Sequence, residues 1–366
     1  MVNRKNYLLV HAHLEYLHDV AQLSEGTISR YRFLLKHLLL WADEIHLAQA
    51  HEVRPSYPAF LRSSRLDGGK GSLAPTTLVK AVRVAKRLLR WAKLTRPLEF
   101  KSLPGLWIDS LKAPRVPQTR TDHQFVSLDE VKALASHKIP ENDLASRRDQ
   151  AAACMLFLSG MRGSAFCSTP INAIDLSSLT IRQWPSLGVR TKMGKSETTY
   201  LLRVPELLEC VKGWDRLARP RLPETAMWYA PTVSRWGDQV LSAEPPGKNR
   251  VTSLAKRMRK LFVAAGLPYK SPHKFRHGHA VFALQHSRTM ADYKAVSMNL
   301  MHSDIKVTDG IYAPLAGQEV RQRIASLTGD DNVDRPAPAI LEAAGTELSR
   351  QEVAERLMDL ARRLAA

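Results

Sequence analysis

The sequence has few cysteines, no long apolar run and no pattern of a cleaved leader. Its three cysteines, Cys154, Cys167 and Cys210, are odd in number and lack the spacing of metal ligands, which predicts reduced intracellular thiols. No apolar run approaches the ~20 residues that a membrane-spanning helix needs, and no charged and apolar leader follows Met1. These absences together predict a cytoplasmic protein that does not act at a membrane.

Acidic residues are scarce relative to basic ones. The chain has 54 Lys and Arg against 35 Asp and Glu, which gives a formal net charge of +19. Residues 1–120 carry 20 basic and 9 acidic side chains and residues 121–327 carry 29 and 18, whereas residues 328–366 carry 5 and 8. This distribution predicts two modules that each contact a polyanion, for which nucleic acid is favoured over an anionic membrane surface.

The length of the chain and the pattern of breaks predict two domains and a mainly α fold with a small β-sheet, an α+β class. Residues 1–112 are expected to form a helical domain, and residues 113–124 a linker. Residues 125–327 are expected to form a mixed α/β domain. Residues 328–366 predict a further linker that ends in an amphipathic helix, which would pack on its own domain or on a neighbouring protomer.

Helical apolar spacing defines the first domain. It runs over residues 7–20 and 27–42, and Gly26 is expected to separate these two helices. A third helix is expected to begin at a cap on Thr76 and to reach Leu94. Its basic side chains share one face, opposite an apolar one. Such a stripe is often only a solvated surface, but in a strongly basic domain it favours contact with phosphates. The stripe consists of Lys80, Arg83, Arg87 and Arg90.

The second domain mixes helical and strand patterns. It opens on a Ser-x-x-Glu capping box at residues 127–130, and an apolar helix is expected around residues 150–158. Residues 176–181 predict a strand, and residues 187–202 a hairpin that is broken at a Met-Gly pair. Residues 252–312 return to a helical pattern.

Within this second domain lie the groups that a metal-free cleavage of a phosphodiester bond requires. Such a reaction must stabilise a pentacoordinate phosphate, supply a nucleophile and protonate the leaving oxygen. Guanidinium groups suit the phosphate because they donate two aligned hydrogen bonds, and a tyrosine oxygen suits a covalent but reversible intermediate. The candidates, in chain order, are Arg162, Lys192, His273, Arg276, His302 and Tyr312.

Each of these motifs is weak when it is taken singly. His273 and Arg276, three residues apart at the start of a predicted helix, share a face, but the same His-x-x-Arg spacing also occurs at His51 and Arg54, where we interpret it as accidental. Only the joint occurrence of the six residues, in one order and inside one basic domain, indicates this chemistry.

In this order and spacing the sequence resembles the tyrosine recombinase or phage integrase family. The resemblance covers residues 1–320 in architecture and 155–315 in motifs. In that family an arginine follows a Thr/Ser-Gly-x triplet, as in Ser159-Gly-Met-Arg162, and a lysine lies in the turn between two strands, as Lys192 would. A Pro-His-x-x-Arg-His box follows, and a histidine precedes the nucleophilic tyrosine by about ten residues.

The resemblance implies a role for each candidate. Arg162 and Arg276 would hold the scissile phosphate with help from His302, Lys192 would protonate the leaving 5′ oxygen, and His273 would assist proton transfer. Tyr312 would form a 3′-phosphotyrosine, so that no metal or cofactor is needed. It also implies that residues 1–112 are a core-binding domain and residues 125–327 a catalytic domain, and that a homotetramer acts on two sites in double-stranded DNA.

The sequence departs from the family pattern at three points. The acidic residue usual three positions after the first arginine is replaced by Ala165, Met301 replaces a common glycine, and the spacing from His302 to Tyr312 is one residue longer than the most frequent one. Lys195 competes with Lys192 for the acid role. His277 and His279 are expected to be structural.

Two other interpretations stay open. One is a DNA-binding architectural protein that kept the fold and lost cleavage, for which Ala165 leaves room. The other is a telomere-resolving or type IB topoisomerase-like enzyme that uses the same residues.

Overall fold

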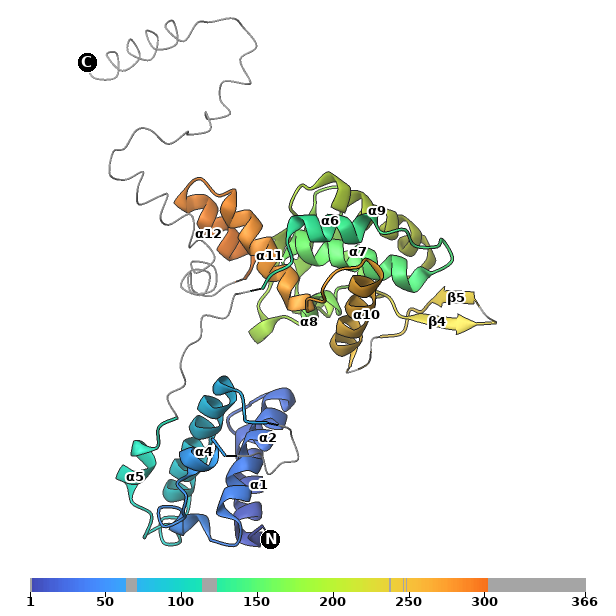
Figure 1. Cartoon of the computed structure of the whole chain (residues 1–366). Helices are drawn as coiled ribbons and strands as arrows, with labels where there is room; N and C mark the ends of the chain where they lie inside the picture. Colours follow the sequence, from blue (N-terminus) through green and yellow to red (C-terminus); the bar gives the residue numbers. More distant parts are fainter. Residues whose placement is uncertain are drawn as a thin grey trace, which may run out of the picture. The chain divides into compact units, whose positions relative to one another are not determined.

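The computed structural model describes residues 2–63, 71–113, 124–236, 238–245, 247 and 249–301. The chain forms two compact units, residues 1–121 and 122–366, which we describe separately (Figure 1). Among the described residues, no helix has both the length and the apolar character that crossing a bilayer requires.

The first unit is helical, as the sequence predicts. Three long helices, α1 (Arg4–Asp19), α2 (Glu25–Ala42) and α4 (Pro75–Thr95), pack against one another and enclose one apolar core (Figure 1). The apolar face of α4 is buried at Val82, Ala85 and Leu89. Shorter elements complete the unit: η1 (Leu47–Gln49), α3 (Tyr57–Phe60) and α5 (Gly105–Ser110).

Two expected helix boundaries in this unit are wrong. Gly26 does not separate the first two helices but lies in the first turn of α2, which Ser24 precedes as the N-cap residue. The chain turns instead at Gln22, whose φ of 52° is the left-handed conformation that ends many helices. Thr76 is not a cap either, because α4 begins at Pro75, a residue whose fixed φ suits a first helical turn.

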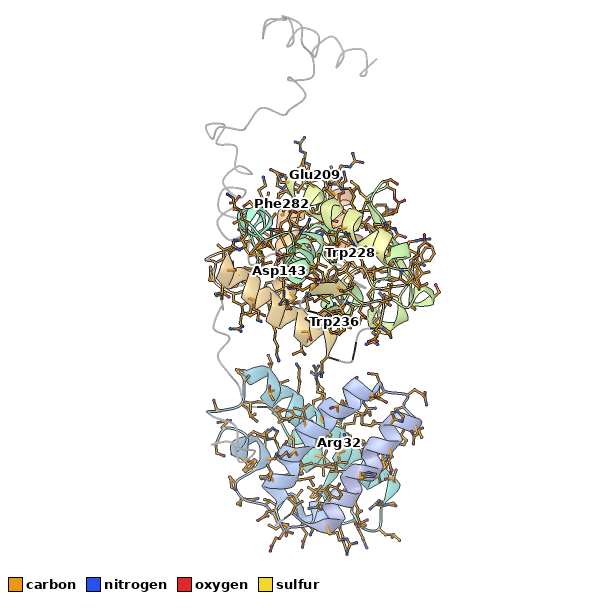
Figure 2. The ribbon with its side chains drawn as sticks, turned by 90° about the vertical axis from the view of Figure 1, so that its right-hand side faces the viewer. Arg32, Asp143, Glu209, Trp228, Trp236 and Phe282 are labelled. Atoms are coloured by element: carbon orange, nitrogen blue, oxygen red, sulfur yellow. The ribbon has the colours of Figure 1, made fainter. Side chains whose placement is uncertain are left out.

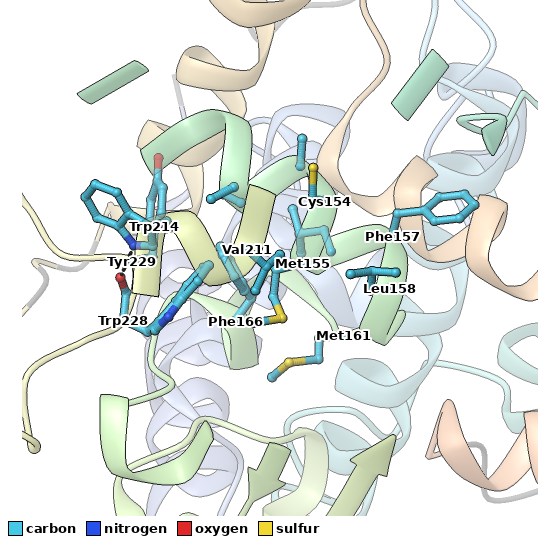
Figure 3. Close-up of a cluster of buried hydrophobic side chains, with 14 of the residues drawn as sticks. Cys154, Met155, Phe157, Leu158, Met161, Phe166, Val211, Trp214, Trp228 and Tyr229 are labelled. Atoms are coloured by element: carbon cyan, nitrogen blue, oxygen red, sulfur yellow. Dashed lines mark hydrogen bonds between the residues drawn. The ribbon is translucent and has the colours of Figure 1, made fainter. Parts of the chain in front are cut away.

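The second unit is built around α7 (Leu144–Ser159). Twelve of its residues are buried, and its neighbours cover it on several sides (Figure 1). Figure 3 shows its side chains Cys154, Met155 and Phe157 in the apolar cluster that also holds Trp228 and Tyr229. The helices that pack against α7 are α6 (Leu128–Ser136), α9 (Pro205–Ala218), α10 (Arg250–Ala264) and α11 (Pro272–Gln285). The short α8 (Gly163–Phe166) packs against α10, and α12 (Met290–Asn299) packs against α11.

The capping box that opens this unit is present as predicted. The Ser127 hydroxyl accepts from the backbone N–H of Glu130 at 3.2 Å, and the Glu130 carboxylate accepts from the backbone N–H of Ser127 at 2.8 Å. The same carboxylate accepts from Lys270 Nζ at 2.6 Å. The start of α6 is thereby tied to the segment that leads into α11.

The predicted strands need correction. The antiparallel sheet has the order β1 (Ile174–Asp175), β2 (Thr180–Gln183), β3 (Glu197–Tyr200), with Ile181 opposite Thr199. Residues 187–202 are therefore not a hairpin by themselves, since β3 pairs with β2. Between β2 and β3 the chain forms two short turns, η3 (Pro185–Leu187) and η4 (Lys192–Gly194). Val189 lies between these turns and is buried in the core, so the chain returns to the core there.

A second hairpin was not predicted. It consists of β4 (Thr232–Arg235) and β5 (Asp238–Leu241), and Gln239 fastens it to the start of α7 by accepting from the backbone N–H of Ala145 at 2.8 Å. At its tip the side chain of Trp236 is fully exposed (Figure 2).

A buried ionic cluster lies between α7, α10 and the segment before β4. The Asp149 carboxylate is 1% exposed and accepts from Arg148 Nη2 at 2.9 Å, from the Tyr229 hydroxyl at 2.6 Å and from Arg257 Nε. The guanidinium of Arg250 stacks over the Tyr229 ring, 4.3 Å from its centroid. Several donors thus share one carboxylate, which partly offsets the positive charge of the surrounding arginines inside the unit.

Candidate active site

The turn after α7 presents the first arginine. Gly160 caps the helix with a φ of 61°, and its N–H donates to the carbonyl of Leu156 at 3.0 Å. A Cβ on Gly160 would lie 2.7 Å from the His279 ring and 2.8 Å from Leu300, so glycine is needed both for the conformation and for the space. Arg162 follows as the N-cap residue of α8, and it is half-buried.

Arg276 joins two loops of the site. It lies on α11, its side chain is 3% exposed, and Nη1 donates to the carbonyl of Gly160 at 2.7 Å. Nη2 donates to the carbonyl of Leu300. Gly160 lies two residues before Arg162 and Leu300 two residues before His302 in the sequence, and one guanidinium holds the backbone together at residues 160 and 300.

His273 lies at the start of α11 in the field of both arginines. Partial desolvation of its ring lowers its pKa, and the positive charges of Arg276, Arg162 and Lys274 lower the pKa further. These groups therefore form one positive site that suits a phosphate, beside an imidazole kept neutral and able to exchange a proton.

The two candidate lysines lie in the loop between β2 and β3. Lys192 is exposed in η4, and Lys195 is half-buried just after it. The turn between them has φ values of 61° at Met193 and 67° at Gly194. The placement of Lys192 between two paired strands matches the pattern on which the resemblance depends, and both lysines remain candidates.

His279 has a structural environment, as expected. Its ring is buried, and Nδ1 lies 2.7 Å from the carbonyl of Phe157. Burial, more than the charge of Arg276, lowers the pKa of His279 to about 4. The neutral ring thus packs α11 against the end of α7. His277 is half-buried, and its ring lies 4.8 Å from that of His273 in a T-shaped contact.

The structure thus brings together Arg162, His273 and Arg276, and it places Lys192 on a loop that hydrogen-bonds to the segment after α8. His302 and Tyr312 lie outside the described residues. Ala165 is buried, and its carbonyl accepts from the hydroxyls of Ser168 and Thr169. Within the described part of the chain, no group of three or more His, Cys, Asp or Glu side chains could hold a metal ion.

The predicted phosphate-binding stripe on α4 is exposed along its whole length, but its members differ. Arg87 donates to the Tyr31 hydroxyl at 3.1 Å, and Arg90 donates to the Asp109 carboxylate at 2.6 Å. Neither Lys80 nor Arg83 has a hydrogen bond or an ion pair with another described residue. These two side chains therefore offer the more available charge.

Sequence reasoning missed the contacts that hold the site together. The partners of Arg276 are backbone carbonyls, which carry no sequence signal. The Asp149 cluster carries only a weak signal, because the Arg-Asp pair at residues 148–149 lies in the polar first half of α7, next to Arg147 and Gln150, and nothing in the sequence distinguishes it as buried.

Comparison with known proteins gives concordant matches. The model of the phage integrase family matches residues 124–319. The chain is 24% identical over 320 residues to tyrosine recombinase XerC of Histophilus somni, across 86% of this chain and 95% of that protein. It is 27% identical over 336 residues to tyrosine recombinase XerC of Pseudomonas fluorescens strain Pf0-1, across 88% and 98%.

Solved structures share the fold. A dimer of lambda integrase residues 75–356 bound to a COC′ core site aligns with a TM-score of 0.56 at 12% identity, over 84% of this chain and 94% of that one. The Tn1549 transposon integrase in complex with transposon right-end DNA aligns with a TM-score of 0.50 at 15% identity, over 89% and 100%. At these identities the likeness concerns architecture alone.

Proposed function

Because the chain belongs to the phage integrase family of tyrosine-type DNA strand transferases, we propose that Tyr312 is the nucleophile with which it cleaves and rejoins DNA. The tyrosine oxygen attacks the scissile phosphorus, the bond to the 5′ oxygen breaks, and a 3′-phosphotyrosine forms. The phosphotyrosyl bond conserves the energy of the phosphodiester, so that attack by a free 5′ hydroxyl rejoins the strand without a cofactor.

The arrangement of Arg276 is the observation that supports this assignment best. Its guanidinium binds the carbonyls that precede Arg162 and His302, and the matched family segment extends past Tyr312. We assign Arg162 and Arg276 to the phosphate oxygens, with help from His302, because preorganised donors stabilise the charge that develops in the transition state.

Protons are assigned to two further groups. Lys192 protonates the leaving 5′ oxygen, with Lys195 in the same loop as the alternative. His273 assists proton transfer, and its lowered pKa supports this role because the ring is then neutral at the pH of the cell.

The DNA is held by both units in this proposal. Residues 1–112 act as the core-binding domain, with the α4 stripe on the phosphate backbone, and residues 125–327 as the catalytic domain, joined by a linker at 113–124. A homotetramer assembles on two DNA sites in the cytoplasm and exchanges strands through a Holliday junction. Residues 328–366 serve as a tail whose helix packs on its own domain or on a neighbouring protomer.

A second candidate function is that of an architectural DNA-binding protein, which the missing carboxylate at Ala165 favours. A nicked substrate that traps the covalent intermediate separates the two. The wild type and Tyr200→Phe, in which the altered tyrosine is exposed on β3, should form an adduct, whereas Tyr312→Phe should bind the DNA and form none. Tight binding without an adduct by the wild type would support the architectural function, and an adduct with Tyr312→Phe would exclude Tyr312 as nucleophile.

The products distinguish a recombinase from its relatives in chemistry. Holliday junctions and exchanged strands from two-site DNA, with a complex of four protomers by mass photometry, are expected. Relaxation of supercoiled DNA that lacks a site would instead indicate a topoisomerase, and hairpin ends would indicate a telomere-resolving enzyme.

A further inference from the structure

One buried hydroxyl connects the turn that begins at Arg162 with the loop between β2 and β3 that carries Lys192, which we call the lysine loop. The side chain of Ser168 is 5% exposed, and its oxygen accepts from the backbone N–H of Arg190 at 2.8 Å. Its own proton is directed at the carbonyls of Ser164 and Ala165, at 2.9 and 3.0 Å. Ser168 therefore bridges two segments that are 22 residues apart in the sequence.

On one side of this bridge the chain is a continuous hydrogen-bonded turn. The N–H of Phe166 donates to the carbonyl of Arg162 at 2.9 Å, and the N–H of Ser168 donates to that of Ala165 at 3.0 Å. Between them, the N–H of Cys167 donates to Gly163 at 3.0 Å. The backbone of Ser168 is thereby fixed relative to that of Arg162.

On the other side, Ser168 binds the lysine loop at Arg190, where the loop begins next to the buried Val189. Val189 is buried in the core, and the N–H of Thr191 donates back to its carbonyl at 3.0 Å. Beyond this point the chain is exposed, with Lys192 at the surface and the Met193 side chain 85% exposed. The Ser168 contact is thus made two residues before Lys192, where the loop leaves the core.

We propose that Ser168 is a positioning residue that sets Lys192 relative to Arg162. This inference rests on the proposed role of Lys192 as the general acid. When the bond from phosphorus to the 5′ oxygen breaks, that oxygen takes a proton from Lys192 Nζ, so the ammonium group must lie within hydrogen-bond reach of an atom whose place the arginines set. Small displacements of such a group cost rate, because proton transfer depends on geometry.

The neighbouring hydroxyl provides a matched control. Thr169 Oγ1 donates to the carbonyl of Ala165 at 2.8 Å, as the Ser168 hydroxyl does at 3.0 Å, and both side chains are buried. Thr169 has no hydrogen bond to the lysine loop among the described residues. Removing its hydroxyl disturbs α8 in a similar way but leaves the Arg190 contact in place.

A DNA substrate with sulfur in place of the bridging 5′ oxygen tests the proposal. A thiol ionises with a pKa of about 8.5, so the thiolate leaves without a proton and the general acid becomes unnecessary. On ordinary DNA, Ser168→Ala should cleave about 10- to 100-fold more slowly than the wild type, with a Kd for DNA within about twofold. On the sulfur substrate its rate should return to within about twofold of the wild type.

Three control variants complete the test. Thr169→Val should behave like the wild type on both substrates, and Arg162→Ala should stay slow on both, because it acts on the phosphate. Ser168→Thr, which keeps a hydroxyl, should cleave ordinary DNA at nearly the wild-type rate. Thermal unfolding of each variant reports whether it is folded.

The proposal is overturned by a full rate of Ser168→Ala on ordinary DNA, by a defect that is equally large on the sulfur substrate, or by an equal loss in Ser168→Thr. Lys192→Ala in the same assay separates this inference from the proposed function. If sulfur rescues Lys192→Ala but not Ser168→Ala, only the positioning role is wrong. If sulfur fails to rescue Lys192→Ala, its role as the general acid is wrong, and the positioning of that acid by Ser168 is overturned with it.

Discussion

In the first unit the predicted stripe of α4, from Lys80 to Arg90, lies at the surface, whereas in the second unit two arginines and an aspartate are almost fully buried. The buried polar side chains of the first unit are uncharged or weakly basic: Asn6, His13 and His37. Those of the second unit include Arg148, Asp149 and Arg276. The first unit thus keeps its positive charge available for a polyanion, and the second uses charge to hold its own loops in place.

This difference has an energetic consequence. An exposed charge is screened by salt and contributes little to stability, whereas a buried charge is costly unless every partner is present. The second unit meets that condition by different means, with a carboxylate for Arg148 and backbone carbonyls for Arg276. Changes to these partners should therefore affect the second unit alone.

The largest expected effect follows from removing the buried carboxylate. Asp149→Asn leaves Arg148 and Arg257 without a counter-charge and should lower the free energy of unfolding of the second unit by about 4 kcal/mol. Calorimetry of the full chain should show the transition of the first unit unchanged. Asp109→Asn, which breaks a surface pair with Arg90, should change the stability of the first unit far less, because both side chains are exposed and water screens the pair. Equal losses in the two variants would contradict the comparison.

Acid should lower the free energy of unfolding of both units, because each contains a buried neutral histidine. Burial lowers the pKa of His13 in the first unit and of His279 in the second to about 4, against about 6.5 in an unfolded chain. Between these pH values the unfolded state binds more protons, so stability falls as the pH decreases from 6.5 towards 4, by about 3 kcal/mol for each histidine. Above pH 6.5 neither group contributes a pH dependence.

Calorimetry at pH 7, 6 and 5 measures this effect. His13→Phe should flatten the pH dependence of the first transition only, because the ring of His13 lies against Trp91, 4.8 Å between centroids, in a site that accepts an aromatic side chain. His279→Gln should flatten only the second. An unchanged slope in either variant would show that other groups govern the acid response of that unit.

The sequence predicted the features that depend on local pattern. The helices of the first unit, the capping box at Ser127 and the fold class follow from periodicity and short-range hydrogen bonds. The break assigned to Gly26 was wrong because a glycine is tolerated in an exposed first turn, while Gln22 takes the left-handed conformation instead. The pairing of β2 with β3 was missed because the partner of a strand is set by tertiary packing and not by the local alternation of side chains.

The candidate site shows the same division. The chemistry restricts the residue types and the resemblance supplies their order and spacing, so the arginines, the histidines and the tyrosine could be named as candidates from the sequence. The partners of Arg276 could not, because backbone carbonyls at residues 160 and 300 are contributed by any residue type. The contact of Ser168 with the lysine loop was missed for a similar reason, because the Ser168 oxygen accepts from the backbone N–H of Arg190, which any residue except proline would supply.

An intermediate effect is expected at Gly160, the turn after α7 against which Arg276 and His279 pack. Gly160→Ala places a methyl group 2.7 Å from His279 and 2.8 Å from Leu300, at a φ of 61°, and should destabilise the second unit by about 2 kcal/mol. Cleavage should also slow, because the Gly160 carbonyl accepts from Arg276. Gly266→Ala has a similar φ of 68° but meets nothing within 4 Å, so it should cost only about 1 kcal/mol and leave cleavage unchanged.

The smallest expected effect concerns the exposed charge of the first unit. Lys80→Gln and Arg83→Gln each remove a cation that has no ion pair with a described residue, so each should weaken DNA binding by about 1 kcal/mol and reduce the salt dependence of log K by about one unit. Arg90→Gln should have less effect, because its charge is already shared with Asp109. Binding measured from 50 to 200 mM salt gives the slopes. Equal salt slopes for Arg83→Gln and Arg90→Gln would show that the pair of Arg90 with Asp109 opens when DNA binds. Arg90 would then contact the DNA as Arg83 does, in preference to its partner in the first unit.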